Sequence, residues 1–188
     1  MLPVPAPATL ALLKGARVRG GGGGHADRGG PAARRRHGIR PAAGDGTARH
    51  RVRRRFRPGR RALPGLGFVL DHLAKAPIAS GELEPWAGLV RELAAEPNVT
   101  AKLSGLITEA APDRWDAETL RPYVGVALDA FGPERLMYGS DWPVCLLAGS
   151  LPAWTATALE LLNDAGLSAA ERDAVFQGTA TRVYGLSG

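Results

Sequence analysis

The sequence has little that would connect it with a membrane or an oxidising compartment. It contains one cysteine, Cys145, so no disulfide can form within the chain, and such usage fits a reducing cytosol. No apolar run approaches the roughly 18 residues of a membrane-spanning helix. The first residues form a short apolar patch that is broken by prolines and has no basic residue before it, which argues against a secretory signal. We expect a cytoplasmic protein with no membrane partner.

Acidic residues are scarce in the first third of the chain. Residues 1–61 contain 15 Arg and one Lys against two acids, whereas residues 62–188 contain eight Lys or Arg against 16 acids. The first segment also holds 12 of the 25 glycines and shows neither a helical nor a strand period. Because such a composition buries too little apolar surface to offset chain entropy, residues 1–61 are predicted to be a disordered, low-complexity segment rich in Arg, Gly, Pro and Ala.

Two interpretations of this basic segment remain open. A basic arm would bind nucleic acid by neutralising phosphates, so the alternative function is a nucleic-acid-binding protein with a non-catalytic α/β domain. The segment's one aromatic residue is Phe56, which gives little support for base stacking. GC-rich coding DNA read out of frame produces the same composition. We favour this second interpretation, and nucleic acid is therefore not an expected partner.

Residues 62–188 alternate between strand and helix patterns. Strands are expected over Gly67 to His72, 98–106 and Arg135 to Ser140, and helices from Pro85, from an N-cap at Asp116 to Phe131, from about Pro152, and from Ser168, which has capping-box spacing to Glu171. The strand starts are one strand, one helix and two loops apart. This spacing predicts a run of βα units with parallel strands.

Polar residues follow the expected strands: Asp71-His72, Lys102 with Ser104, and Ser140-Asp141. In a parallel βα array, ligands gather at the carboxyl ends of the strands. An imidazole and a carboxylate at that edge suit metal-assisted or acid/base hydrolysis, in which His72 binds a metal or polarises a carbonyl oxygen and Asp141 takes a proton from water.

Each of these residues also has a purely structural interpretation. His72 can be a hydrogen-bonded strand-end histidine, Asp141 can cap the turn at Trp142-Pro143, and the ammonium group of Lys102 can extend to the rim. Strand alternation predicts that Asp71 points away from His72 and anchors a neighbouring loop. Trp142 follows a strand end and could form a pocket wall, whereas the other tryptophans are expected to pack between helices.

Four segments together resemble the C-terminal part of the amidohydrolase-related family, in its sugar-lactone and dicarboxylate lactonase branch. They are FVLDHLAKAPI (68–78), NVTAKLSGL (98–106), AFGPERLMYGSDWPV (130–144) and VFQGTATRVYGL (175–186). They occur in the family's order and cover about residues 63–187. Each alone would be weak, but their joint specificity is high.

The resemblance implies a partial (β/α)8 TIM barrel over residues 62–188 and a hydrolase that acts on a lactone. It implies that His72 and Asp141 are catalytic, that Trp142 lies near the substrate, and that His72 and Asp141 bind any metal. One divalent ion such as Zn, or none, would be the cofactor, because the family varies in this respect. The family's first strand, with its His-x-His pair, is missing here, so we expect a truncated fragment with little or no activity of its own.

Overall fold

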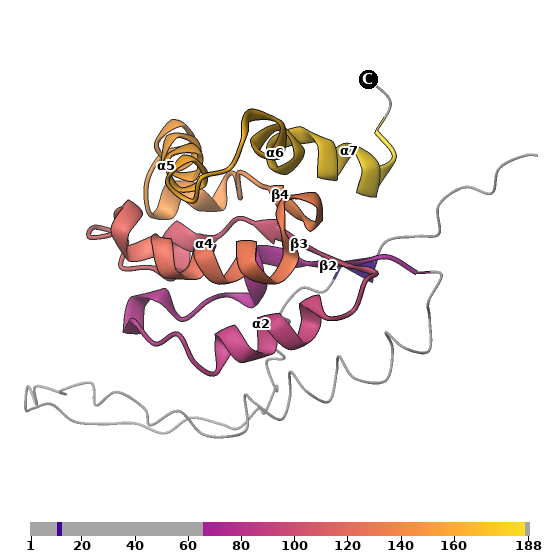
Figure 1. Cartoon of the computed structure of the whole chain (residues 1–188). Helices are drawn as coiled ribbons and strands as arrows, with labels where there is room; N and C mark the ends of the chain where they lie inside the picture. Colours follow the sequence, from indigo (N-terminus) through magenta and orange to yellow (C-terminus); the bar gives the residue numbers. More distant parts are fainter. Residues whose placement is uncertain (1–10, 13–65, 187–188) are drawn as a thin grey trace, which may run out of the picture.

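A computed structural model describes residues 11–12 and 66–186 of the chain (Figure 1). Its sheet has four parallel strands in the order β1-β2-β3-β4: β1 (Ala11–Leu12), β2 (Phe68–Leu70), β3 (Val99–Leu103) and β4 (Leu136–Tyr138). Strand β1 pairs with the start of β2 and was not predicted from composition. The rest of the predicted low-complexity segment, residues 1–61, lies outside the described residues.

The helices are α2 (Trp86–Ala94), α3 (Leu106–Glu109), α4 (Ala117–Phe131), α5 (Leu151–Asp164), α6 (Ala169–Asp173) and α7 (Thr179–Tyr184). Helices were predicted at α2, α4, α5 and from Ser168, whereas α3 was not predicted and follows a strand β3 that ends at Leu103, before the predicted 106. Both predicted caps are present. Asp116 accepts a hydrogen bond from the backbone N–H of Thr119, and Ser168 forms a reciprocal capping box with Glu171. Within the described ranges, none of the helices has the length and hydropathy to cross a membrane.

Helices α2, α4 and α5 form a layer beside the sheet, and α4 contacts both of the other two (Figure 1). The parallel register aligns Leu70 with Ala101, and Ala101 with Leu136. These three side chains are buried in the hydrophobic core together with residues of the helices. One face of the sheet therefore supplies the core, and the helical layer covers it.

The second sheet face carries Val69, Thr100, Lys102 and Met137, which align across the same register. Along β3 the burial alternates, with Val99, Ala101 and Leu103 buried and the two residues between them partly exposed. Lys102 therefore lies on the face opposite α2, α4 and α5, where its Nζ is 5.9 Å from the ring centre of Tyr184 on α7. A lysine can occupy a strand there because its aliphatic stem packs on the sheet while its ammonium group finds a charged partner.

The amino-terminal end of the sheet is tied together by Arg135, which immediately precedes β4. Its Nη1 donates to the backbone oxygens of Ala94 at 2.8 Å and Glu96 at 3.3 Å, at the end of α2, and its Nη2 donates to that of Ala130 at 3.3 Å. The guanidinium carbon also lies 5.5 Å from the ring centre of Phe131. Hydrogen bonds from Arg135 to backbone oxygens therefore fix the amino-terminal end of the sheet. The polar residues that could take part in chemistry follow the strands at the opposite, carboxyl-terminal end.

Candidate active site

The three strands β2, β3 and β4 end at the same edge, and each contributes polar groups to one cluster. His72 Nδ1 lies 2.9 Å from the Oγ of Ser104, and His72 Nε2 lies 3.6 Å from the Oδ1 of Asp141. Ser104 directly follows β3 and is buried, whereas the side chain of His72 is 30% exposed. The structure thus brings together an imidazole and a carboxylate that are 69 positions apart in the sequence.

His72 sits in a left-handed turn that the sequence did not predict. After β2, the residues Asp71–Ala74 form a 3-10 turn in which His72 has φ 47° and ψ 40°, and φ remains positive through Lys75. Asp141 also has a positive φ, of 53°. Left-handed backbone costs roughly 1–2 kcal/mol for each residue with a side chain, so both candidate residues occupy strained positions of the kind that functional sites often contain.

This turn overturns the expectation for Asp71. Strand alternation predicted that Asp71 would point away from His72, but β2 ends at Leu70 and the left-handed turn reverses the direction of the next side chains. Asp71 Oδ2 lies 3.1 Å from His72 Nε2, and its side chain is only 6% exposed. Asp71 is therefore part of the cluster, and the prediction that it points away from His72 was wrong because the strand does not continue to His72.

Lys102 compensates the charge of this buried carboxylate. Its Nζ lies 3.2 Å from Asp71 Oδ1, an oxygen that has no hydrogen bond of good geometry within the described part of the chain. Burial opposes the charge on Lys102, but the charge of Asp71 and the hydroxyl of Tyr184 outweigh it and raise the lysine pKa above its ordinary value. Lys102 therefore stays protonated, and its ammonium group pairs with Asp71 beside His72.

The partners of His72 indicate its tautomer. Nε2 faces the carboxylates of Asp71 and Asp141, which only accept hydrogen bonds when ionised, so Nε2 is assigned as the N–H donor. In the neutral ring Nδ1 then accepts the hydroxyl proton of Ser104. The single N–H at Nε2 therefore faces the two carboxylates in the free site.

Two glycines allow this close packing. Gly105 has φ +70°, and a Cβ built on it would lie 2.9 Å from His72 Cβ. A Cβ on Gly139 would lie 3.0 Å from the Cβ of Ser104. Any side chain at either position would push on the groups that hold the imidazole, so the site requires glycine at both.

Trp142 lies at the rim next to Asp141. It is 63% exposed, and its backbone N–H donates to the Oγ of Ser140 at 3.2 Å. Exposed apolar side chains follow it in the loop, including Val144, Leu146 and Leu147. Trp86 and Trp154 are buried on α2 and α5 as expected, whereas Trp115 precedes α4 and is only partly buried. Each of the three indole N–H groups also donates to a loop carbonyl, a contact that no sequence pattern predicted.

A metal ion would need more ligands than these residues supply. Catalytic zinc sites use three protein ligands, and structural ones use four. Across residues 11–12 and 66–186, no group of three or more His, Cys, Asp and Glu is arranged to hold a metal ion. The carboxylate of Asp71 is engaged with Lys102. The described residues therefore do not form a metal site on their own.

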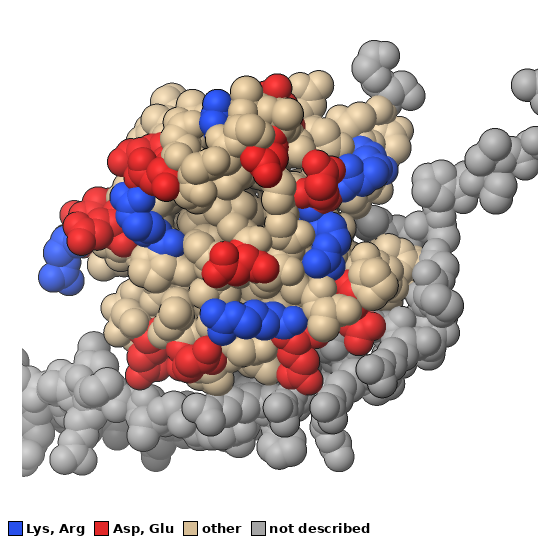
Figure 2. Space-filling model, in the orientation of Figure 1, with Lys and Arg blue, Asp and Glu red and all other residues tan. Residues whose placement is uncertain are grey.

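Charges of both signs are interspersed over the face drawn in Figure 2, where Lys and Arg lie next to Asp and Glu. Several are exposed pairs, such as Arg121 with Asp164 and Arg182 with Glu134. The view shows no broad basic surface on the described residues of this face. The Arg-rich segment on which the nucleic-acid interpretation depends lies outside the described residues.

The chain is similar to proteins of known family over most of its described part. An L-fucono-1,5-lactonase of Burkholderia multivorans is 48% identical over 128 residues, which cover 63% of this chain and 43% of that protein. An amidohydrolase from Burkholderia multivorans solved with bound Zn has a TM-score of 0.62 and 42% identity, over 68% of this chain and 50% of that one. The same enzyme with bound Hepes gives a TM-score of 0.61 and 41% identity, over 68% and 51%.

The chain spans less than half the length of the curated lactonases that it matches. The match to the family described as Amidohydrolase runs from residue 17 to residue 186, so it includes part of the Arg-rich segment as well as the whole of the site. This match covers most of the sequence and agrees with the resemblance carried by the four motifs. The chain belongs to the amidohydrolase family.

Proposed function

We propose that this site hydrolyses a lactone, a cyclic ester of a sugar acid or related hydroxy acid. The observation that carries the proposal is the separation of 3.6 Å between His72 Nε2 and Asp141 Oδ1 at one edge of the sheet. This distance brings a hydrogen-bond donor and a proton acceptor to the same small molecule. The naming of the similar Burkholderia proteins as L-fucono-1,5-lactonases supports the substrate class.

In the proposed reaction Asp141 is the general base. It takes a proton from water, whose oxygen forms a bond to the carbonyl carbon. The Nε2–H of His72, which faces the carboxylates in the free site, turns to the carbonyl oxygen and donates to it as negative charge develops there. The bond between this carbon and the ring oxygen then breaks. The proton held by Asp141 passes to the leaving ring oxygen, and the product is an open hydroxy acid.

We propose further that β2, β3 and β4 with their helices are part of a (β/α)8 barrel. The parallel order, the helical layer on one face and the polar cluster at the carboxyl ends fit that architecture. In it the face that carries Lys102 would look into the barrel. The full site would then include side chains from strands beyond the described residues.

Two finer assignments belong to the same proposal. Trp142, exposed beside Asp141, would contact the apolar side of the sugar ring. If the protein uses a divalent ion such as Zn, His72 and Asp141 would be two of its ligands, with the others supplied from outside the described residues. The expected partner is a small molecule.

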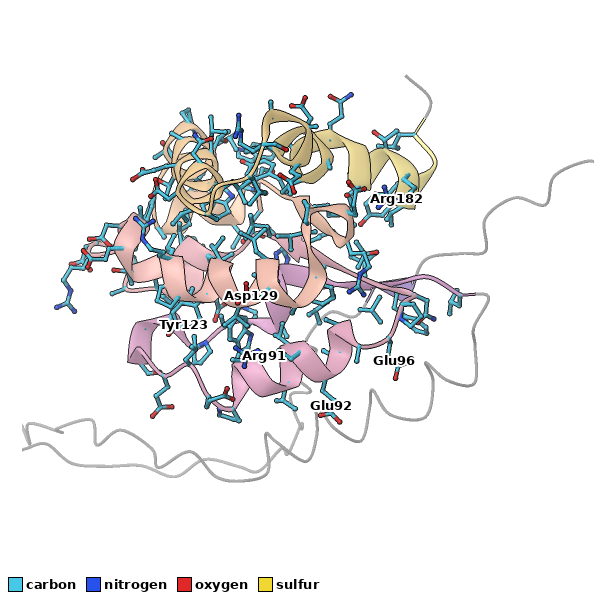
Figure 3. All side chains as sticks on the ribbon, viewed as in Figure 1. Arg91, Glu92, Glu96, Tyr123, Asp129 and Arg182 are labelled. Atoms are coloured by element: carbon cyan, nitrogen blue, oxygen red, sulfur yellow. The ribbon has the colours of Figure 1, made fainter. Side chains whose placement is uncertain are left out.

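The test is hydrolysis of sugar 1,5-lactones by the full chain, followed by proton release in a weakly buffered indicator assay. We expect a rate above spontaneous ring opening that Asp141→Asn abolishes. Asp129→Asn is the matched control, because Asp129 is an exposed aspartate on α4 (Figure 3), whereas the cluster lies at the ends of β2, β3 and β4. A rate that is the same in the chain and in Asp141→Asn would overturn the proposal.

A further inference from the structure

Two buried tryptophans hold the two turns that carry His72 and Asp141. The indole Nε1 of Trp86, on α2, donates to the backbone oxygen of Leu73 at 2.7 Å. The indole Nε1 of Trp154, on α5, donates to the backbone oxygen of Gly139 at 2.9 Å. Leu73 is next to His72 in the left-handed turn, and Gly139 begins the turn that leads to Asp141.

The carbonyl oxygen of Leu73 depends on the indole of Trp86 because of the turn geometry. A left-handed turn points its carbonyls away from any regular ladder, and the side chain of Leu73 is fully buried, so water has little access. Gly139 is half-buried, and the indole of Trp154 fixes its carbonyl oxygen at the start of the turn that leads to Asp141. A buried carbonyl without a donor costs roughly 1–3 kcal/mol. The indole N–H removes this cost only when the turn keeps its present conformation, and it therefore favours the strained conformation over a relaxed one.

Each indole is itself fixed by packing. Trp86 is 6% exposed, and its ring centre lies 5.4 Å from that of Tyr123. Figure 3 shows Tyr123 on the side of α4 that faces α2. Trp154 is 1% exposed and stacks with Tyr138, with 6.1 Å between ring centres. Two hydrogen bonds thus connect the turns that carry His72 and Asp141 to tightly packed side chains of α2 and α5.

We propose that Trp86 and Trp154 are positioning residues, which set the distance between His72 and Asp141 by clamping the turn on which each resides. Neither touches the reacting atoms. The clamp itself follows from the contacts above, and its effect on hydrolysis rests on the proposed function. Each tryptophan acts on a different turn, so each serves as the control for the other.

The experiment measures amide hydrogen exchange by NMR in the full chain and in the variants Trp86→Phe and Trp154→Phe, which retain an aromatic ring and lose the N–H. The Lys75 amide, which donates to His72 O at 2.8 Å, reports on the first turn. The Cys145 amide, which donates to Asp141 O at 2.9 Å, reports on the second. Arg135→Lys, at the other end of the sheet, is the control for general destabilisation.

We expect Trp86→Phe to accelerate exchange of the Lys75 amide roughly two- to tenfold, the effect of one lost hydrogen bond, and to leave the Cys145 amide unchanged. Trp154→Phe should do the reverse. Arg135→Lys should accelerate core amides of β3 at least as much as the two turn amides. Equal acceleration throughout the fold in both tryptophan variants, or no acceleration in the turns, would overturn the clamp.

Should a phenylalanine variant fail to fold, the same position is replaced with 3-benzothienylalanine, which keeps the bicyclic shape and has sulfur in place of the N–H. The lactone assay is run in parallel, and there the clamp predicts a fall in kcat with KM little changed. Loss of turn protection without any lactone hydrolysis in the parent chain would support the clamp and count against the proposed function. Hydrolysis by the parent chain, together with unaltered turn protection in the two tryptophan variants, would support the proposed function and overturn the clamp.

Discussion

Ser104 Oγ lies 2.9 Å from His72 Nδ1, and this contact joins the end of β3 to the turn after β2. Ser104 is 1% exposed, so its hydroxyl has little access to water as an alternative partner. The carboxylates on the Nε2 side decide which imidazole nitrogen carries the proton, and the hydroxyl at Nδ1 fixes which way the ring faces. The serine therefore acts on the proposed chemistry through the orientation of His72.

Replacing Ser104 with alanine should leave the fold intact and weaken hydrolysis. The imidazole loses its Nδ1 partner and can rotate or change tautomer, so we expect a loss in kcat of roughly three- to tenfold, the magnitude of one hydrogen bond. Side-chain ¹⁵N shifts of His72 at a single pH would show mixed tautomers. Ser80→Ala, which removes an exposed hydroxyl that donates to Pro77 O, is the control. A single unchanged tautomer in Ser104→Ala would contradict this role.

Replacing Lys102 with methionine should destabilise the fold, because the buried carboxylate of Asp71 loses its cation. We expect a loss of about 1–3 kcal/mol in the free energy of unfolding at pH 7, measured with urea. Lys75→Met is the matched control, because Lys75 is 63% exposed and its surface pair with Glu109 contributes little. Equal losses in the two variants would show that burial of Asp71 does not depend on Lys102.

The same pair makes stability depend on pH in a defined direction. The pKa of Lys102 is raised in the folded chain above its ordinary 10.5. Its contribution is therefore fully present below pH 10.5 and is lost as pH rises through the raised value. The difference in unfolding free energy between the parent chain and Lys102→Met should be constant from neutral pH to pH 10 and narrow above 10.5.

The sequence predicted the parts of this fold that depend on local patterns. Hydrophobic periods and caps located the helices, and Asp116 and Ser168 cap them as expected. The rule that parallel strands end at one edge was enough to bring His72 near Asp141. Each of these inferences needs only nearby residues and a general rule of topology.

What the sequence did not predict depends on contacts between distant segments. The left-handed conformation of His72 is stabilised by Trp86, 14 residues later, and is accommodated because Gly105 has no Cβ. No local pattern signals it, because positive φ is unfavourable for each of these residues alone. The wrong prediction for the direction of Asp71 has the same cause, because strand alternation applies only while the strand continues and β2 ends at Leu70. The roles of Trp142 and of a metal ion remain predictions.

Replacing Gly105 with alanine should be among the most damaging small changes to the site. The backbone φ of +70° disfavours any side chain, and the new Cβ would lie 2.9 Å from His72 Cβ. We expect a loss of about 2 kcal/mol or more in the free energy of unfolding, with a shift of the His72 ring signals by NMR. Gly67→Ala is the matched control, because a Cβ there meets nothing within 4 Å. Equal free energies of unfolding for the Gly105→Ala and Gly67→Ala variants would contradict this prediction. They would show that a Cβ at Gly105 fits beside His72 and that the turn there is not tightly packed.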